Sequence, residues 1–523
     1  MRLSKGLIRY LDSSPSPFHA VSTAAARLQE AGFTKIEAAG GLKNLVPGAK
    51  HYYHFDGSLV AFAVGGQLIP GNHAFKIMAA HTDSPTLKVK SRSRRMPTSA
   101  ASSWAKQISV ETYGGGLWHT FLDRDLSVAG RVIVRNEDGT LSRRLVHCQQ
   151  PILRVPSLCI HLQDAAEREA LHVNKEDHLQ PIICDRIRES LSEEPARTFT
   201  GSGWTANQEP VLLSILGKEM GLQDVDNIAD FDLVLFDTQG ATLGGAHQEY
   251  IFSARLDNLA SCFLTVEALC DHASGESSTS SLDEDEDVSV VALFDHEEVG
   301  SVSASGAGSP IMNDAINRIT AALMEGEDKG PGPTRYGMGG LPLTSRMAES
   351  HRAALSRSLI LSVDQAHAVH PNFASKHDLK GAGPTGMSAV PGYGLAPVLN
   401  GGPVIKSNGN QRYATLSSGG GFVVRELGRR ALNNIENRSS KEVATLQESE
   451  LQEFSVRNDC PCGSTIGPII SAATGIRAVD LGMPQLSMHS CREMMGRHDL
   501  DTTYELFCYF LKNFRTVDES LVD

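Results

Sequence analysis

The sequence lacks an uninterrupted apolar run that could enter a membrane. The first ten residues carry charges every few positions, so no secretory signal peptide is expected. The longest uncharged stretch, residues 381–405, spans 25 positions, which is enough for a transmembrane helix. Seven of these residues are glycine and four are proline, and we therefore expect a flexible loop instead. These absences predict a cytoplasmic protein without a membrane segment.

Cysteine is too scattered to build a disulfide framework. The chain has nine cysteines, an odd number, without regular spacing. Cys460 and Cys462 are separated by a single residue, but no second pair follows that could complete a structural zinc site. A disulfide or a zinc ion at this pair is therefore disfavoured, and free thiols in a reducing cytosol are the preferred interpretation.

Positive charge is also in deficit. Lysine and arginine total 48 against 61 aspartate and glutamate residues, which gives a net charge of −13. A negative field repels phosphate, so nucleic acid is not expected as the main partner. By the same sum an acidic small substrate is disfavoured, an inference that the motifs below qualify. The length of 523 residues favours roughly three domains, and 41% hydrophobic with 21% charged residues is typical of a globular protein.

The secondary-structure signals change character along the chain. Residues from about 105 to 165 read mostly as β-strands, with a hairpin turn at residues 136–139. From residue 251 onward, strands alternate with helices, which is typical of an α/β sheet. The segment 274–287 is rich in serine, aspartate and glutamate and is predicted to be a solvated loop. Helices are expected at residues 18–31 and from 256 onward, and buried strands at residues 75–80, 288–294 and 359–363.

Side chains able to bind a metal directly follow these buried strands. His81 follows the first, the segment 295–298 (Asp-His-Glu-Glu) follows the second, and Asp364 follows the third. Asp257 begins a helix, and His489 follows a short segment that ends in methionine. Because sites in open α/β sheets form at the carboxyl ends of the strands, these residues could converge on one crevice.

The residue types suit borderline divalent metals. Two histidines with several carboxylates favour zinc, manganese or cobalt. Asp83 lies two residues after His81 and could accept its second imidazole N–H. In the pair Glu297-Glu298, one carboxylate could bind a cation while the other acts as a base. Taken singly, each feature has a structural alternative: a capped turn, a surface Glu-Glu pair, or a helix N-cap at Asp257. Their joint placement favours a two-metal site.

The chain resembles the aspartyl aminopeptidase family of dinuclear zinc exopeptidases over nearly its whole length. Family motifs occur in the family's order. They are the segments His81-Thr82-Asp83-Ser84-Pro85, Glu111-Thr112-Tyr113-Gly114-Gly115-Gly116, Asp123-Arg124-Asp125-Leu126, Asp257-Asn258, Asp295-His296-Glu297-Glu298-Val299-Gly300-Ser301, Val363-Asp364, Ala366-His367-Ala368-Val369-His370-Pro371, Gly402-Pro403-Val404-Ile405-Lys406, Arg457-Asn458-Asp459 and Met488-His489-Ser490 with Arg492-Glu493.

The resemblance implies a role for each matching position of the metal site. His81 and Asp364 would hold one Zn²⁺, Glu298 and His489 would hold the other, and Asp257 would bridge the two ions. Mn²⁺ or Co²⁺ could exchange for zinc. Glu297 would be the general base that activates the attacking water, and Asp83 would orient His81.

The resemblance also implies how substrates are chosen. In the family an acidic substrate side chain contacts a lysine, a tyrosine and a histidine, which match Lys406, Tyr413 and His161. The histidine enters the site from a neighbouring subunit. From the residues alone, a half-buried strand histidine is the favoured interpretation of His161. His367 is a candidate for stabilising the oxyanion. The implied function is removal of N-terminal Asp or Glu from peptides.

Family members consist of a catalytic α/β/α sandwich domain interrupted by a β-rich oligomerisation domain, and they assemble from dimers into a tetrahedral dodecamer. Here the catalytic domain would comprise residues 1–91 and 247–523, and the insert residues 92–246. Two loops depart from the family pattern, 274–287 and 381–401, and the second lies close in sequence to the expected specificity residues.

Three alternative functions follow from the same residues. The first is the same chemistry with another N-terminal preference, such as a neutral residue. The second is a metal-dependent deacylase, which would cleave N-acylated compounds that have no free amine. The third is a non-catalytic scaffold, which the presence of both Asp257 and Glu297 disfavours.

Overall fold

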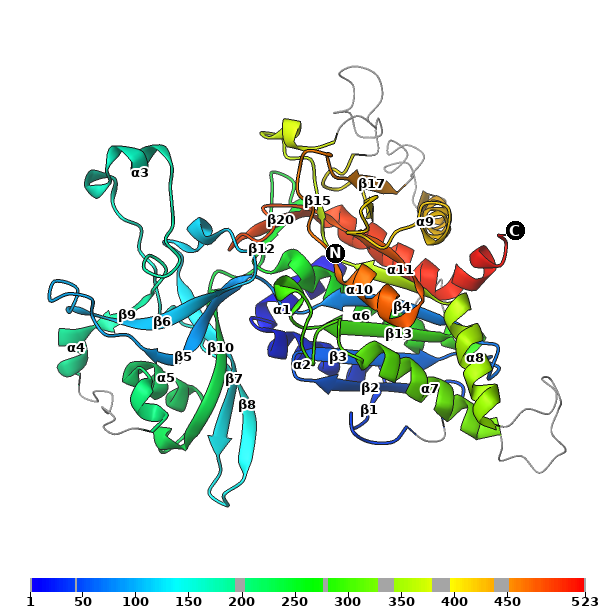
Figure 1. Cartoon of the computed structure of the whole chain (residues 1–523), viewed down its shortest axis with the longest axis horizontal. Coiled ribbons are helices and arrows are strands. Elements are labelled where there is room, and N and C mark those ends of the chain that lie inside the picture. Colours follow the sequence, from blue (N-terminus) through cyan, green and yellow to red (C-terminus); the bar gives the residue numbers. More distant parts are fainter. Residues whose placement is uncertain are drawn as a thin grey trace.

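A nine-stranded mixed sheet forms the centre of the larger of two lobes (Figure 1). The computed structural model describes residues 2–42, 45–192, 203–275, 281–327, 343–378, 396–436 and 451–521. The four central strands, β13, β4, β14 and β18, are parallel to one another. In sheet order the strands are β1 (Thr34–Lys35), β2 (Lys50–Phe55), β3 (Ser58–Val64), β13 (Val288–Phe294), β4 (Phe75–His81), β14 (Leu359–Val363), β18 (Arg477–Gly482), β16 (Val404–Ser407) and β17 (Gln452–Ser455).

The central strands are covered on both faces. Strands β4, β13 and β14 are buried at every position, as expected for near-continuous apolar runs inside a parallel sheet. The three buried strands predicted from the sequence are thus confirmed, as is the α/β/α sandwich. One face packs against α1 (Arg2–Ser13), α2 (Pro17–Glu30), α6 (Leu256–Ser274), α9 (Gly420–Glu436) and α11 (Arg497–Asp518), and the other against α7 (Ile311–Glu327), α8 (Leu343–Arg357) and α10 (Ile466–Thr474).

Helix α2 shows how local sequence sets these elements. Ser16 caps the helix by accepting from the backbone N–H of His19, and Pro17 occupies the first turn, where its missing N–H costs nothing. The apolar side chains Ala20, Val21 and Leu28 are buried. The helix predicted at residues 18–31 is therefore confirmed.

The second lobe is built on a six-stranded antiparallel sheet with its own apolar core (Figure 1). The hairpin predicted around residues 136–139 is confirmed, with Arg135 opposite Leu141. The sheet begins at Thr86, and the division at residues 92 and 246 stays a prediction. The strands in order are β8 (Leu141–His147), β7 (Leu126–Arg135), β10 (Ile228–Asp237), β5 (Thr86–Arg94), β6 (Ala105–Tyr113) and β9 (Ile182–Asp185), with the helices α3 (Ala165–Glu169), α4 (Arg186–Ser190) and α5 (Pro210–Glu219).

A small five-stranded sheet lies where the two lobes meet (Figure 1). It brings together strands that are far apart in the sequence and holds the loop that carries His489. Its order is β11 (Thr242–Gly244), β12 (Tyr250–Ser253), β20 (Glu493–Gly496), β19 (Pro484–Leu486) and β15 (Ala366–His367).

The acidic segment before β13 is only partly the solvated loop that its composition predicts: Asp283, Glu284 and Glu286 are exposed, whereas Asp285 and Asp287 are not. The Asp285 carboxylate is buried and accepts from the Lys76 ammonium at 2.7 Å, and it contacts the imidazole of His272 at 2.9 Å. Asp287 is buried as well and pairs with Arg515. Burial alone would raise the pKa of Asp285, but Lys76 and His272 lower it below its usual value. The prediction is wrong for these two carboxylates because composition does not reveal the cations that neutralise them.

Two parts of the predicted loops, residues 276–280 and 381–395, lie outside the described residues. Among the helices of the described ranges, none is long and apolar enough to cross a membrane. All nine cysteines are free thiols.

Candidate metal centre

The five predicted metal ligands lie together at one edge of the nine-stranded sheet. His81 is the last residue of β4, and Asp364 directly follows β14. Glu298 lies in a single 3₁₀ turn (Glu297–Val299) just after β13. Because β4, β13 and β14 are parallel neighbours, their carboxyl ends place these side chains side by side.

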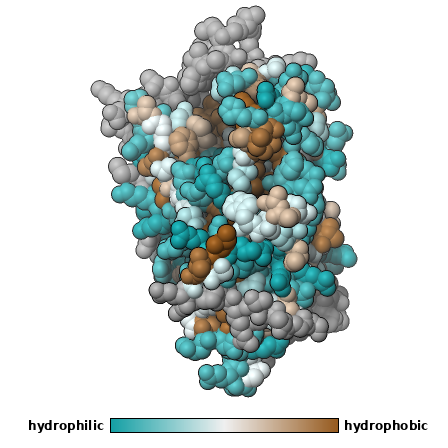
Figure 2. Space-filling model, turned by 90° about the vertical axis from the view of Figure 1, so that its left-hand side faces the viewer, coloured by the Kyte–Doolittle hydropathy of each residue, from teal (hydrophilic) through white to brown (hydrophobic). Residues whose placement is uncertain are grey.

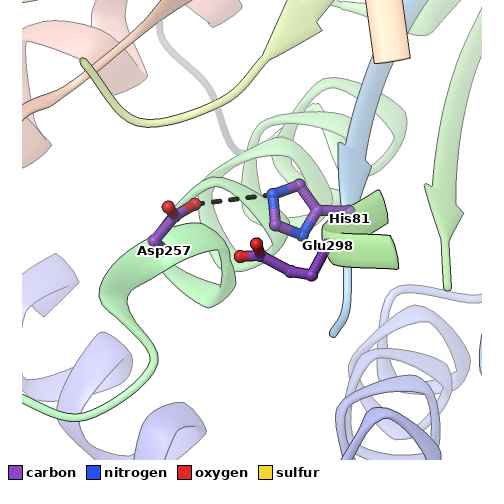
Figure 3. Close-up of side chains that lie close together, drawn as sticks. All are labelled: His81, Asp257 and Glu298. Atoms are coloured by element: carbon purple, nitrogen blue, oxygen red, sulfur yellow. Dashed lines mark ion pairs between the residues drawn. The ribbon is translucent and has the colours of Figure 1, made fainter. Parts of the chain in front are cut away.

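Asp257 lies between the two histidines. One carboxylate oxygen is 3.4 Å from Nε2 of His81, and the other is 3.4 Å from Nε2 of His489. Figure 3 shows Asp257, at the start of α6, with His81 and Glu298; ligand atoms of these three side chains lie within 4.8 Å of one another. This arrangement is the one that a carboxylate bridging two cations would need.

The remaining carboxylates divide between the two histidines. An Asp364 oxygen lies 3.3 Å from Nε2 of His81, and a Glu298 oxygen lies 3.3 Å from Nε2 of His489. Glu297 lies farther out, with its nearest oxygen 3.9 Å from Nε2 of His81. The geometry therefore contains two overlapping sets of donors that share Asp257.

Backbone carbonyls fix the tautomer of both imidazoles. Nδ1 of His81 donates to the carbonyl oxygen of Asp83 at 3.1 Å, and Nδ1 of His489 donates to the carbonyl oxygen of Gly115 at 3.2 Å. A carbonyl can only accept, so Nδ1 carries a proton in each ring, and in the neutral imidazole that binds a metal the lone pair is on Nε2, which faces the cluster. This is how a metal-binding histidine is usually held.

The Asp83 carboxylate holds the turn that carries the two glutamates. It accepts the backbone N–H of Glu297 and that of Glu298, each at 3.0 Å, and the Tyr113 hydroxyl at 2.7 Å. It lies 3.4 Å from Nδ1 of His81, slightly farther than the carbonyl of Asp83 itself. The sequence predicted Asp83 as the partner of His81; its carboxylate also positions the Glu297-Glu298 turn.

Glu493 is a positioning residue to which the sequence analysis assigned no role. Its carboxylate accepts the backbone N–H of Asp257 at 3.0 Å and that of His489 at 2.8 Å. It thereby ties the bridging aspartate to the loop of the second histidine. Burial, followed by the charge of Asp257, raises the pKa of Glu493 to about 8. Glu493 could have been noticed in the sequence because it belongs to the same motif as His489, four residues further on.

The carboxyl groups of the cluster are buried next to one another, and this raises their pKa values. Burial and then the charge of Asp364 raise the pKa of Glu297 to about 9, and burial and then Asp257 raise that of Glu298 to about 7. Although burial opposes it, Asp257 and Glu298 raise the pKa of His489 to about 11. Charges of one sign packed this way call for neighbouring cations.

Two buried carboxylate oxygens are available to bind such cations. Oδ1 of Asp257 and Oε1 of Glu298 accept no hydrogen bond from any described residue. A buried carboxylate oxygen without a partner is costly unless it binds a proton or a metal ion. Two imidazole nitrogens and several carboxylates suit Zn²⁺ among the biological divalent ions, so the residues present fit such a site.

Lys406 and Tyr413 flank this cluster. The Lys406 ammonium is buried and donates to an oxygen of Asp364 and to the carbonyl of Gln365, both at 3.1 Å. It lies 5.3 Å from the centroid of the Tyr413 ring. The His367 ring lies 5.4 Å from that of Phe454, on which Tyr413 also packs. Lys406 is thus ion-paired with a predicted metal ligand, a contact that the sequence did not indicate.

His161 does not join the cluster within its own chain. It lies in a short 3₁₀ turn (Ile160–Leu162) of the second lobe and is exposed. Among the described residues it makes no hydrogen bond or ion pair with the residues above. The strand position that the residues alone favoured for His161 is therefore wrong.

Comparisons with known proteins point to one family of zinc metalloproteases. Residues 10–511 match the family model described as aminopeptidase I zinc metalloprotease (M18). The probable aspartyl aminopeptidase of Ricinus communis is 38% identical, and the alignment covers 99% of this chain and 97% of that protein. A cryo-EM structure of an Ape4 and Nbr1 complex superposes with a TM-score of 0.82 at 36% identity, over 100% of this chain and 87% of that one. The mApe1 dodecamer of Saccharomyces cerevisiae superposes with a TM-score of 0.73 at 25% identity, over 99% and 98%.

Proposed function

Because the chain belongs to the aminopeptidase I zinc metalloprotease (M18) family and is a metallo-aminopeptidase, we propose that it removes acidic residues, Asp or Glu, from the N-termini of peptides. The observation that carries the proposal is the position of Asp257 between His81 and His489, with Lys406 beside Asp364. The relatives named aspartyl aminopeptidase support the acidic preference.

Five side chains would hold two zinc ions. His81 and Asp364 would bind one, Glu298 and His489 the other, and Asp257 both. Mn²⁺ or Co²⁺ could replace zinc because the donor set is of borderline hardness. When bound, the ions would polarise the scissile carbonyl and lower the pKa of a water molecule, so that it loses a proton more readily and becomes a better nucleophile.

Glu297 would move the proton. It lies beside the donor set without being the nearest carboxylate to either histidine. Its carboxylate would accept a proton from the attacking water and return it to the nitrogen of the leaving amine. Its pKa of about 9 belongs to the cluster without cations. Neighbouring divalent charge favours the ionised carboxylate, which is the form that a base requires.

Lys406 and Tyr413 would bind the acidic side chain of the substrate. An ammonium has three N–H donors, and those of Lys406 facing Asp364 and Gln365 account for two. The third could donate to a substrate carboxylate. The Tyr413 hydroxyl would supply a second donor nearby, and His367 would lie close to the developing oxyanion.

Substrates and chelators offer the direct test of this function. With aminoacyl anilides, we expect rapid cleavage of Asp and Glu derivatives and slow cleavage of the Leu derivative. Chelation followed by gel filtration should abolish all cleavage, because the carboxylates would lose the cations that polarise the carbonyl, and added Zn²⁺, Mn²⁺ or Co²⁺ should restore it. An N-acetylated Asp anilide should not be cleaved. Rapid Leu cleavage without Asp or Glu cleavage would support the neutral-preference alternative instead.

The second lobe would assemble the enzyme and deliver His161 to a neighbour. The side chains around His161 are apolar and exposed: Leu158 by 50%, Ile160 by 63% and Leu162 by 71%. Figure 2, which faces this lobe, shows brown apolar side chains gathered in its upper part. An exposed apolar patch of this kind is typical of an interface. We therefore propose a homo-oligomer, of the dodecameric type seen in the mApe1 relative.

Complementation between two inactive variants would test the role of His161. His161→Ala and Glu297→Gln should each show little activity on Asp substrates. Co-expressed, they should form mixed oligomers in which an intact metal centre receives His161 from a neighbouring chain, and a measurable fraction of activity should return. Mass photometry would give the size of the assembly. Mixed oligomers without recovered activity would exclude a contribution in trans.

A further inference from the structure

A loop of the second lobe reaches the metal centre. Residues 113–117, which we call the bracing loop, join the end of β6 to a short 3₁₀ helix (Trp118–Phe121). At the first end, Tyr113 pairs with Thr86 of the neighbouring strand β5. At the other end, the aromatic side chains at both termini of the 3₁₀ helix are buried in the apolar core of the second lobe. The position of the bracing loop is therefore set by the second lobe.

The bracing loop holds both the imidazole and the backbone of His489. The carbonyl of Gly115 accepts from Nδ1 of His489 at 3.2 Å, and the backbone N–H of Leu117 donates to the carbonyl of His489 at 2.9 Å. Just beyond the loop, the Thr120 hydroxyl accepts the backbone N–H of Cys491 at 2.8 Å. His489 has a φ of +66°, a region that residues other than glycine adopt mainly where neighbouring contacts hold them. Here the second lobe supplies several of those contacts.

The same loop contacts the turn that carries Glu298. The Tyr113 hydroxyl donates at 2.7 Å to the Asp83 oxygen that also accepts the backbone N–H of Glu298 at 3.0 Å. Gly114 lies directly on this turn, because a Cβ atom at Gly114 would be 3.1 Å from the Cβ of Glu298. The φ of Gly114 is +74°, which favours glycine. Glycine thus lets the bracing loop approach the glutamate this closely.

The side chains assigned to the first ion alone have no contact of this kind. Among the described residues, the His81 imidazole and the Asp364 carboxylate form their hydrogen bonds and ion pairs within the larger lobe, with Asp83, Asp257, Glu297, Lys406 and each other. The Asp83 oxygen near His81 is not the one that accepts the Tyr113 hydroxyl. The second lobe therefore contacts both ligands that serve only the second ion and neither ligand that serves only the first.

We propose that the bracing loop is a positioning element for the second ion, so that the affinity of the Glu298–His489 site depends on the second lobe and that of the His81–Asp364 site does not. The inference rests on the proposed function, which assigns these ligands to two ions. Removing an outer partner of a metal ligand typically lowers metal affinity by about 10–100-fold. A loss of that size at one site only is the expected signature of this loop.

Two substitutions disturb separate contacts of the bracing loop. Tyr113→Phe keeps the ring but removes the hydroxyl that donates to Asp83, so the oxygen shared with the Glu298 backbone loses one of its donors. Gly114→Ala places a methyl group against Glu298 and adds the cost of a positive φ for alanine. Neither substitution changes a proposed metal ligand or the proposed base.

Each substitution has a matched control elsewhere in the chain. Tyr52→Phe also removes a buried hydroxyl with a partner, which accepts from Gln29 at 2.7 Å, but it lies on β2 away from the metal centre. Gly139→Ala adds a methyl group at a φ of +82° in the hairpin of the second lobe, where no atom lies within 4 Å of the added carbon. The controls therefore reproduce the chemical change without the contact to the metal centre.

The experiment measures zinc binding to the full-length protein without substrate. Each protein is dialysed against buffers of fixed free Zn²⁺, bound zinc per chain is determined by elemental analysis, and circular dichroism verifies the fold. In Tyr113→Phe and Gly114→Ala, one of two binding steps should shift to about 10–100-fold higher free Zn²⁺, and the other should stay in place. Anomalous diffraction at the zinc edge, between the two steps, should find the remaining ion at His81 and Asp364. Both controls should bind zinc as the wild type does.

Three outcomes would overturn the proposal: equal weakening of both steps in the variants, loss of the ion at His81 and Asp364 instead of the other, or a shift in the controls as large as in the variants. Two ions bound with unshifted steps in both variants would likewise exclude a role of the loop, while leaving the two-ion centre intact. A wild type that binds fewer than two ions would contradict the proposed centre itself. The failure of the inference and that of the proposed function are therefore distinguishable.

Discussion

Glu297→Gln is expected to lower kcat by about 10²–10⁴-fold, the usual contribution of a general base, while the zinc content stays at the wild-type level. Glutamine keeps the size and the polar character of the side chain but cannot accept a proton from water. The backbone N–H of residue 297 would still donate to Asp83, so the turn should keep its conformation. The loss should therefore appear in kcat with KM almost unchanged.

The adjacent residue provides a matched control. Glu298→Gln makes the same chemical change one position along, but the Glu298 carboxylate faces His489 at 3.3 Å and has an unpartnered buried oxygen. We expect that variant to lose metal, measured by elemental analysis, and to recover partly with excess Zn²⁺. If Glu297→Gln kept near wild-type kcat with full metal, Glu297 would not be the base.

The strand-end argument explains why so much of the centre could be predicted. Uninterrupted apolar runs make strands that are buried on both faces, and the first polar residue after each run must lie at the sheet edge. His81, Glu298 and Asp364 follow such runs, and all three lie in the cluster. Asp257 and His489 follow no such buried strand; they were candidates by residue type, and the family motifs supplied their expected roles.

Contacts between distant segments could not be predicted in this way. Lys76 is a single charged residue among the apolar residues of a buried strand. Nothing in the local sequence indicates that its ammonium neutralises Asp285, which lies 209 positions away. Likewise, Lys406 and Asp364 are 42 positions apart and belong to motifs with separate expected roles. Charge compensation across a core depends on the tertiary fold, and composition led to the opposite expectation for Asp285 and Asp287.

That ion pair changes what we expect of Lys406→Met. The Lys406 side chain is only 2% exposed, and its charge helps to keep the pKa of Asp364 well below its usual value despite burial. Methionine would leave a buried carboxylate without this partner. All substrates, including Leu anilide, should therefore lose some activity through the disturbed position of Asp364. Asp and Glu substrates should lose far more activity, because their side-chain carboxylate also loses the Lys406 ammonium that would bind it.

The difference between substrates, rather than the absolute loss, measures the specificity of Lys406. Truncating one partner of a buried charge pair costs about 2–5 kcal/mol, and tenfold in rate corresponds to about 1.4 kcal/mol, so acidic substrates should lose at least about 30-fold more kcat/KM than Leu anilide. Tyr413→Phe is the companion variant: it leaves the Lys406–Asp364 pair intact and should lower only the acidic substrates, by about tenfold. Equal losses of Asp, Glu and Leu substrates in Lys406→Met would mean that Lys406 serves Asp364 alone. The acidic preference would then have to reside in Tyr413 and in His161 from a neighbouring chain.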